Sequence, residues 1–301
     1  MPAYISHAIM GKNLYEELID NKLMEIEVDK REMKGYSLGI DLSKLSHHLS
    51  SDPHNDSTRD FFLYMINYIK KNHLYQNKHA ISLLYGHIAH YFLDINIHPY
   101  VNYLTDNTKQ YGVISNHHLI EGYINSYLAK EILGKNRLDL EDTYFNQIDL
   151  SEEAVISLLR DTYRILYKEP NIINVYRKVM DTFSGIEKAI KISKFKEKTL
   201  VALSGFKTFM KKNNITESDL INEFHKPYYG MDKKEENLSL LDMYNKSLLE
   251  AIYAIYEVNK ILYKDKDRDI LNKVFEDISY DTGISCQKTK ILTLKRKRNQ
   301  M

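Results

Sequence analysis

The sequence predicts an all-α protein, and three observations support this fold class. Apolar residues recur with the helical period of 3.6 in a succession of long segments. The 301 residues include only 5 prolines and 11 glycines, the two residue types that interrupt helices most strongly. Convincing segments with the alternating pattern of a β-strand are missing. We therefore expect a multi-helix bundle.

The predicted helices follow one another along the chain. The segment 60–72 places Phe61, Met65 and Ile69 on one stripe, and 77–98 is apolar nearly all round, which predicts a central buried helix. The other expected helices cover residues 116–133, 151–167, 171–184, 185–213, 236–263 and 267–279. Four prolines fall between these segments, where helices should end: Pro53, Pro99, Pro170 and Pro227.

Composition and charge exclude several classes of protein. Lys plus Arg number 42 and Asp plus Glu 41, a net charge of +1, which argues against a surface built throughout to bind nucleic acid or an anionic membrane. The single cysteine, Cys286, excludes an internal disulfide and a zinc site made mainly of thiolates. The start, MPAYISHAIMGKNLYEEL, shows no signal-peptide pattern, and no run of about 18 apolar residues occurs. We therefore expect a cytoplasmic protein.

The histidines are distributed unevenly. Eleven of the 12 precede residue 122, and only His225 follows it. Surface histidines without a shared role would not gather in this way, whereas a metal site would gather them, because neutral imidazole is a common zinc ligand.

The spacing of acidic and histidine residues sharpens this prediction. His90, Asp94 and His98 are four residues apart and project from one face of the predicted helix 77–98. His117 and Glu121 repeat the spacing on the next helix, where an i,i+4 ion pair is the alternative interpretation. An aspartate inside the apolar string YFLDINI is costly to bury unless a cation neutralises it. Imidazoles and carboxylates from two helices can form a multinuclear metal site in a bundle core.

Other polar residues could complete the site. His7 lies near the start of the first helix, and Asp41 and His54 occupy segments that look like loops. His87 shares the stripe of His90, but a histidine hydrogen-bonded in the core is the expectation for it, and His118 is expected to be a bystander. One of His47 and His48 could line the site.

Several other chemistries are excluded. The chain contains no HExxH, no His-Asp dipeptide, no phosphate-binding P-loop and no GxGxxG. Cys286 lies far along the chain from the histidines, which argues against a nucleophilic cysteine.

The sequence resembles the zinc-dependent phospholipase C family, which is related in fold to the zinc nucleases that cut single strands. The resemblance covers roughly residues 4–125, with a weaker echo over 224–248. Its most specific part is the G-x-x-x-H-x-x-x-D-x-x-x-H-P-Y string that starts at Gly86. The other matching segments are SHAIMG, LGIDL, PHNDSTRDFF and NHHLIEGYI.

The resemblance implies two or three zinc ions between helices. Residues similar to the ligands of a first zinc are Asp41, His54, His90 and Asp94. Those of a second are His98, His117 and Glu121, and those of a third are His7 and the bridging Asp94. Asp41 is also a candidate catalytic base. The sequence departs from relatives at Asn125, where an aspartate is frequent, and at Tyr228 and Tyr229, where a tryptophan is common.

We therefore expect one all-helical domain over 1–301. Its metal-binding half covers about 1–130, and a C-terminal helical half covers about 150–285, with a seam at 132–150. A basic tail, 288–301, is expected to be a solvated end without regular structure, with a localisation or anionic-surface signal as the alternative.

The expected function is that of a zinc-dependent phosphodiester hydrolase, most simply a phospholipase C acting on a phospholipid or a related phosphoester through a metal-activated water. Such a substrate would bring transient membrane contact, although no amphipathic anchor is evident. Two alternatives remain open: a single-strand-specific zinc nuclease, for which the charge balance gives no strong nucleic-acid signal, and a non-enzymatic helical protein with a structural zinc site.

Overall fold

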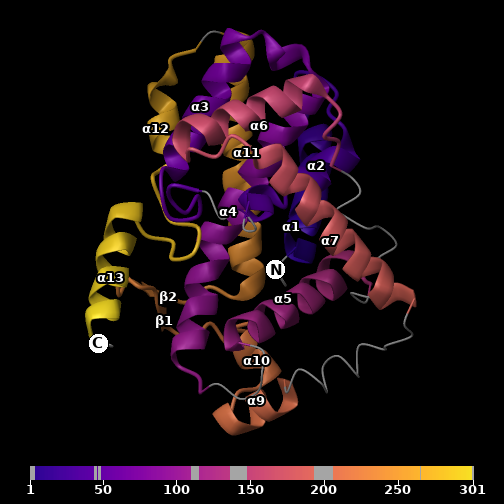
Figure 1. Ribbon diagram of the computed structural model, residues 1–301. Coiled ribbons are helices and arrows are strands. Elements are labelled where there is room, and N and C mark those ends of the chain that lie inside the picture. The colour runs from indigo at the N-terminus through magenta and orange to yellow at the C-terminus, as the bar shows by residue number, and fades with distance from the viewer. Residues whose placement is uncertain are drawn as a thin grey trace.

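The computed structural model describes residues 4–43, 46, 49–109, 115–135, 148–192, 206–264 and 266–299. The protein is all-α, as predicted, and its only strands in these ranges form one two-stranded sheet (Figure 1). The main helices are α1 (Tyr4–Asp20), α2 (Lys30–Tyr36), α3 (Thr58–Lys71), α4 (Lys78–Asp106), α5 (Asn116–Leu133), α6 (Glu153–Leu166), α7 (Ile172–Ile192), α9 (Phe206–Asn213), α11 (Leu240–Lys264) and α13 (Cys286–Asn299).

Shorter elements connect these helices. They are η1 (Gly39–Ser43), η2 (Leu74–Gln76), α10 (Glu217–Leu220), β1 (Tyr228–Tyr229), β2 (Glu235–Glu236), η5 (Arg268–Ile270) and α12 (Leu271–Val274). The strands β1 and β2 pair antiparallel, with Tyr228 opposite Glu236. The expected seam at 132–150 lies largely outside the described residues, and so do His47 and His48.

Helix α4 is the centre of the fold. Asn77 begins it by accepting hydrogen bonds from the backbone N–H groups of His79 and Ala80, the usual way in which an N-cap residue satisfies the free donors of the first turn. Its residues are buried on nearly all sides, because α1, α2, α5 and α11 pack around it. The prediction of a central buried helix is confirmed, and the polar residues of α4 are therefore enclosed by other helices.

The prediction that a helix ends at Pro99 is wrong, because α4 continues through this proline to Asp106. A proline in a helix interior leaves the carbonyl four residues earlier without its partner, at a cost of about 3 kcal/mol. The packing around α4 offsets this cost, and the segment around Gly283 packs over Pro99. A Cβ on Gly283, which has a φ of +68°, would lie 2.5 Å from Pro99 Cγ and 2.9 Å from the Ile95 carbonyl oxygen.

Two further expectations are corrected by the fold. Asp41 is not in a loop, because Gly39–Ser43 forms the buried 3₁₀-helix η1 between α2 and α3. The basic tail is not irregular, because Cys286–Asn299 forms α13. This helix is attached to the bundle through the buried Cys286, whose Sγ lies 3.6 Å from Thr58 Oγ1. Among the described residues, no helix has the length and apolar character that crossing a membrane requires.

Gly86 allows α2 and α4 to approach closely. A Cβ at this position would lie 2.6 Å from both the carbonyl carbon and the Cβ of Tyr36. We predict that Gly86→Ala lowers the free energy of unfolding by about 1–3 kcal/mol, because the overlap outweighs the better helix propensity of alanine. Urea denaturation measures this change. Ser157→Ala at a partly exposed position of α6 serves as the control and should stay within about 0.5 kcal/mol of the parent. An unchanged Gly86→Ala would contradict the close packing.

Candidate metal centre

Five parts of the fold bring the predicted ligands together. His7 comes from the second turn of α1, Asp41 from η1, and His54 from the turn before α3. The remaining five come from α4 and α5: His90, Asp94, His98, His117 and Glu121. All except His117 are at least nine-tenths buried. The i,i+4 spacings on the two helices therefore project inward, as predicted.

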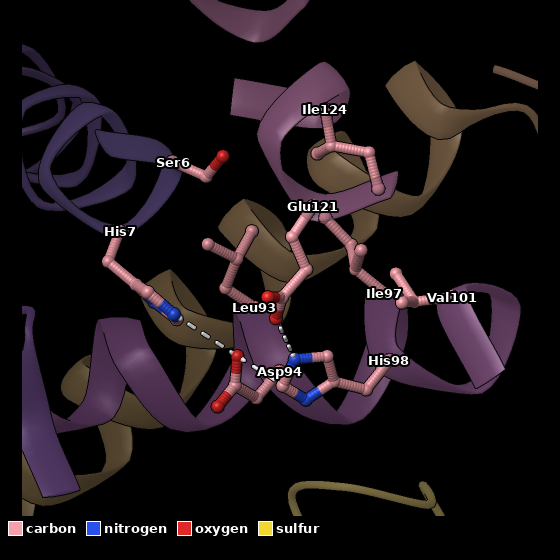
Figure 2. A pocket seen from close by; sticks show the side chains of 9 residues that line it. All are labelled: Ser6, His7, Leu93, Asp94, Ile97, His98, Val101, Glu121 and Ile124. Atoms are coloured by element: carbon pink, nitrogen blue, oxygen red, sulfur yellow. Dashed lines mark hydrogen bonds and ion pairs between the residues drawn. The ribbon is translucent and has the colours of Figure 1, made fainter. Parts of the chain in front are cut away.

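Asp94 connects the members of this cluster. Its Oδ1 lies 3.2 Å from His7 Nε2, and its Oδ2 lies 3.1 Å from His90 Nε2. His98 Nδ1 lies 3.7 Å from Oδ1, and Figure 2 shows His7 and His98 reaching Asp94 from different elements. One carboxylate thus contacts three imidazoles, the arrangement expected of a bridging ligand.

The surrounding side chains form three groups, in each of which one ligand atom per residue lies within 4.8 Å of the others. The groups are His7 with Asp41 and His90; His54 with His90 and Asp94; and His98 with His117 and Glu121. Atoms bound to one tetrahedral zinc at about 2.0–2.2 Å lie about 3.3–3.6 Å apart, so small adjustments would suit these groups to zinc. The third group is the one that the family resemblance predicts for a separate ion.

Two further sets of close contacts involve Asp41 and Glu121. His54 Nε2 lies 2.9 Å from Asp41 Oδ1. On α5, Glu121 Oε1 lies 3.2 Å from His117 Nε2 and 3.3 Å from His98 Nε2, so that one carboxylate oxygen joins α4 and α5. Every predicted ligand therefore has another predicted ligand within contact distance.

Backbone and side-chain acceptors orient three of the imidazoles. His90 donates its Nδ1–H to the Ser37 carbonyl at 3.1 Å, and His98 donates its Nδ1–H to the Tyr280 carbonyl at 2.9 Å. His54 Nδ1 lies 3.4 Å from Asp52 Oδ1. Such partners fix the ring so that Nε2 faces the metal, and they raise its basicity as a ligand. The sequence reasoning missed all three partners.

The chemistry of His90 and Asp94 tests whether a cation fits. Because His90 Nδ1 donates to a carbonyl, the neutral ring presents a lone pair at Nε2, which faces Asp94 Oδ2. Both atoms are buried and neither has a hydrogen-bond partner. Two acceptors that face each other at 3.1 Å in a buried site need a positive charge between them. A divalent metal ion supplies that charge, so the residues fit zinc.

Burial and mutual charge shift the pKa values of the cluster strongly in the absence of metal. Burial lowers the pKa of His90, although Asp94 opposes the change. Burial would also raise the pKa of Asp94, but the charges of His98, His90 and His7 hold it well below its usual range. Burial alone would lower the pKa of His98, but Asp94 and Glu121 raise it to about 10. A proton on His98 therefore takes the place of part of the missing cationic charge.

Two neighbouring histidines behave differently. His87 is a core residue, as expected: it donates to the Leu83 carbonyl, stacks on Phe61 with ring centroids 5.3 Å apart, and burial lowers its pKa to about 4. His118 is more than a bystander, because its Nδ1 lies 3.3 Å from Glu121 Oε2. A three-residue spacing on one helix could have shown this contact in the sequence.

Asn125 holds α5 against the start of α1. Its Oδ1 accepts hydrogen bonds from the backbone N–H of Ser6 at 2.9 Å and from the Ser6 hydroxyl at 2.6 Å. The next residue along α1 is the candidate ligand His7. The buried Asn125 amide thus anchors α1 beside the cluster.

A small cavity of about 20 Å³ adjoins the ligands, enough space for about one water molecule. One side is formed by the candidate ligands His7, Asp94, His98 and Glu121, and Figure 2 shows these side chains around it. The other side is aliphatic and consists of Leu93, Ile97, Val101 and Ile124, together with the Ser6 hydroxyl. Among the described residues that line it, none is a lysine or arginine.

Comparison with known families identifies the class of protein that this site defines. A family model described as zinc dependent phospholipase C matches residues 6–173, which is more than half of the chain. This range includes every candidate ligand. The chain therefore belongs to the zinc-dependent phospholipase C family. Comparison with curated proteins gave no match, and comparison with solved structures gave none.

The contrast between Asp94 and His87 tests the ligand set. We predict that Asp94→Asn loses most of the bound zinc, because the neutral amide neither bridges two dications nor offsets their charge. His87→Leu should keep its full zinc content, because His87 contacts Leu83 and Phe61 rather than the cluster. Elemental analysis of both purified variants measures the zinc content. Equal zinc content would contradict the assignment.

The raised pKa of His98 predicts a pH dependence for the metal-free chain. Its pKa is near 6.5 when unfolded and about 10 when folded, so its contribution to stability is complete below pH 6.5 and declines as the pH rises towards 10. We predict that the chelator-treated protein unfolds at lower urea concentration at pH 8.5 than at pH 6.5. His98→Asn should reduce this difference, and a parent protein more stable at pH 8.5 would contradict the ion-pair geometry.

Proposed function

We propose that this protein is a zinc-dependent phosphodiesterase that hydrolyses phospholipids with the specificity of a phospholipase C. The observation that carries the proposal is the buried Asp94 carboxylate, which contacts three imidazoles and leaves acceptors facing each other without a cation. Membership of the family supports the reaction type. The substrate and the role of each residue are our inferences.

The proposed ligands hold two or three zinc ions. His98, His117 and Glu121 would hold one, and His54, His90 and Asp94, together with Asp41 beside His54, would hold another. His7 and Asp94 would hold a third. When bound, zinc at these positions supplies Lewis acidity towards the phosphoryl oxygens and lowers the pKa of water.

The ligand residues also set the charge of the site. Asp41, Asp94 and Glu121 contribute three negative charges, one fewer than the positive charges of two zinc ions. The loaded site is therefore positive and attracts a phosphodiester anion. Asp41 is buried and lies 2.9 Å from His54 Nε2, so both side chains would face the same ion, and the Asp41 carboxylate would accept a proton from the attacking water there.

The lining of the cavity gives no support for a nucleic-acid substrate. Beside the ligands it consists of the buried aliphatic residues Leu93, Ile97, Val101 and Ile124. A single-strand nuclease combines aromatic stacking surfaces with a basic groove, and the described lining provides neither. The preference for a phospholipid therefore follows from membership of the family.

The proposal predicts hydrolysis of phosphodiesters by the zinc-loaded protein. A chromogenic phosphocholine ester should be cleaved, a chelator should abolish the reaction, and added zinc should restore it, because the ligand imidazoles and carboxylates act only together with metal. Parallel assays with phosphatidylcholine and single-stranded DNA determine the substrate class. His87→Leu is the matched control and should keep its activity, whereas His90→Ala should lose it.

Two other outcomes of these assays would contradict the proposal. Cleavage of DNA alone would replace the phospholipase proposal with the nuclease. Fully bound zinc without turnover of either substrate would favour a structural metal site.

A further inference from the structure

We propose that Tyr280 is a positioning residue of the metal centre, and that the C-terminal segment 277–286 belongs to the site although it supplies none of the candidate ligands. The segment lies well beyond residue 173, where the family match ends. The inference rests on the proposed zinc ligands. In this proposal, Tyr280 keeps the rings of His54, His90 and His98 in the orientation that binds zinc.

The backbone of Tyr280 contacts two candidate ligands. Its carbonyl accepts the Nδ1–H of His98 at 2.9 Å, which directs Nε2 of that ring towards Glu121. Its N–H donates to the carbonyl of His54 at 2.8 Å. One peptide segment therefore links the turn that carries His54 to the helix that carries His98.

The ring of Tyr280 contacts a third ligand as well. Its centroid lies 5.6 Å from that of His54, at an interplanar angle of 68°, and 5.6 Å from that of His90. Tyr280 is 1 % exposed, so the ring fills the space behind both imidazoles and leaves them little freedom to rotate. A smaller side chain would release both rings.

Side chains next to the ligands hold this segment in place. Asn55, the neighbour of His54, donates to Asp281 Oδ2 at 2.6 Å and accepts from Ser279 Oγ at 2.5 Å. Asn102, one turn after His98 on α4, donates to the Asp281 carbonyl. The residues on both sides of Tyr280 are thus tied to the same two elements whose ligands Tyr280 orients.

Two further contacts fix the ends of the segment. Thr58 Oγ1, on the first turn of α3, donates to the Ile278 carbonyl at 2.8 Å. At the other end, Gly283 lies against Pro99, directly after His98. The carbonyl of Ile95, which the proline leaves without its helical partner, lies close to Gly283. The hydrogen bond that α4 lacks at Pro99 therefore lies where the C-terminal segment docks.

This arrangement has a physical consequence for metal binding. Zinc affinity depends on imidazoles that are oriented before the ion arrives, and loss of an orienting partner typically lowers metal affinity about 10–100-fold. Loss of the Tyr280 ring leaves His54 and His90 free to rotate, and a shift of the segment removes the acceptor of His98. The effect should therefore reach both proposed zinc groups.

The test compares zinc affinities of full-length variants by competition with a chromophoric chelator. Tyr280→Leu should lower the affinity at least tenfold, whereas Tyr280→Phe, which keeps the ring and backbone, should bind as the parent does. Tyr244→Leu is the matched control, because Tyr244 is 2 % exposed on α11 and none of the candidate ligands contacts it among the described interactions. It should lose stability without losing affinity.

A second variant guards against failure to fold. Asn102→Ala removes a partly exposed side chain and one tie to the segment, and it should lower zinc affinity severalfold while the thermal unfolding temperature changes little. Parent-like zinc affinity in both Tyr280→Leu and Asn102→Ala would overturn the inference and leave the proposed function intact. Absence of zinc binding by the parent chain would overturn the proposed function and this inference with it.

Discussion

The burial of one carboxylate is the constraint on which the rest of this structure depends. Asp94 lies inside the central helix, 3 % exposed, with imidazoles from α1 and from both neighbouring turns of α4 around it. A buried charge of this kind is stable only when opposite charge compensates it. A proton on His98 contributes to this in the metal-free chain, and a zinc ion would contribute more charge. The helices packed around α4 keep this charge away from solvent.

Close packing of the helices orients the side chains of the candidate ligands. Gly86 lets α2 approach α4, and this approach places the Ser37 carbonyl against His90. Gly39, with a φ of +51°, leaves no space for a Cβ beside the same imidazole. Asn125 ties α1 to α5 next to His7. Small residues and buried hydrogen bonds therefore orient the candidate ligands.

The C-terminal part of the chain completes the site from outside the region that defines the family. Proline within α4 would ordinarily weaken the helix near His98, yet the segment around Tyr280 and Gly283 packs on this point and supplies the acceptor for His98. The proline inside α4, the candidate ligand His98 and the docked C-terminal segment thus lie together. This coincidence shows how the candidate metal cluster contacts residues that contribute no candidate ligand.

The sequence by itself determined the helical class, the central buried helix and the clustering of the candidate ligands with i,i+4 spacing, because the helical period places His90, Asp94 and His98 on one face regardless of what surrounds them. Only the tertiary structure decided that α4 passes through Pro99, that Asp41 lies on a 3₁₀-helix and that His118 reaches Glu121. It also brought Tyr280 to His98 across 182 positions of the chain. Contacts over such distances follow from how helices pack, and packing depends on the shape of the whole core, which no local period encodes.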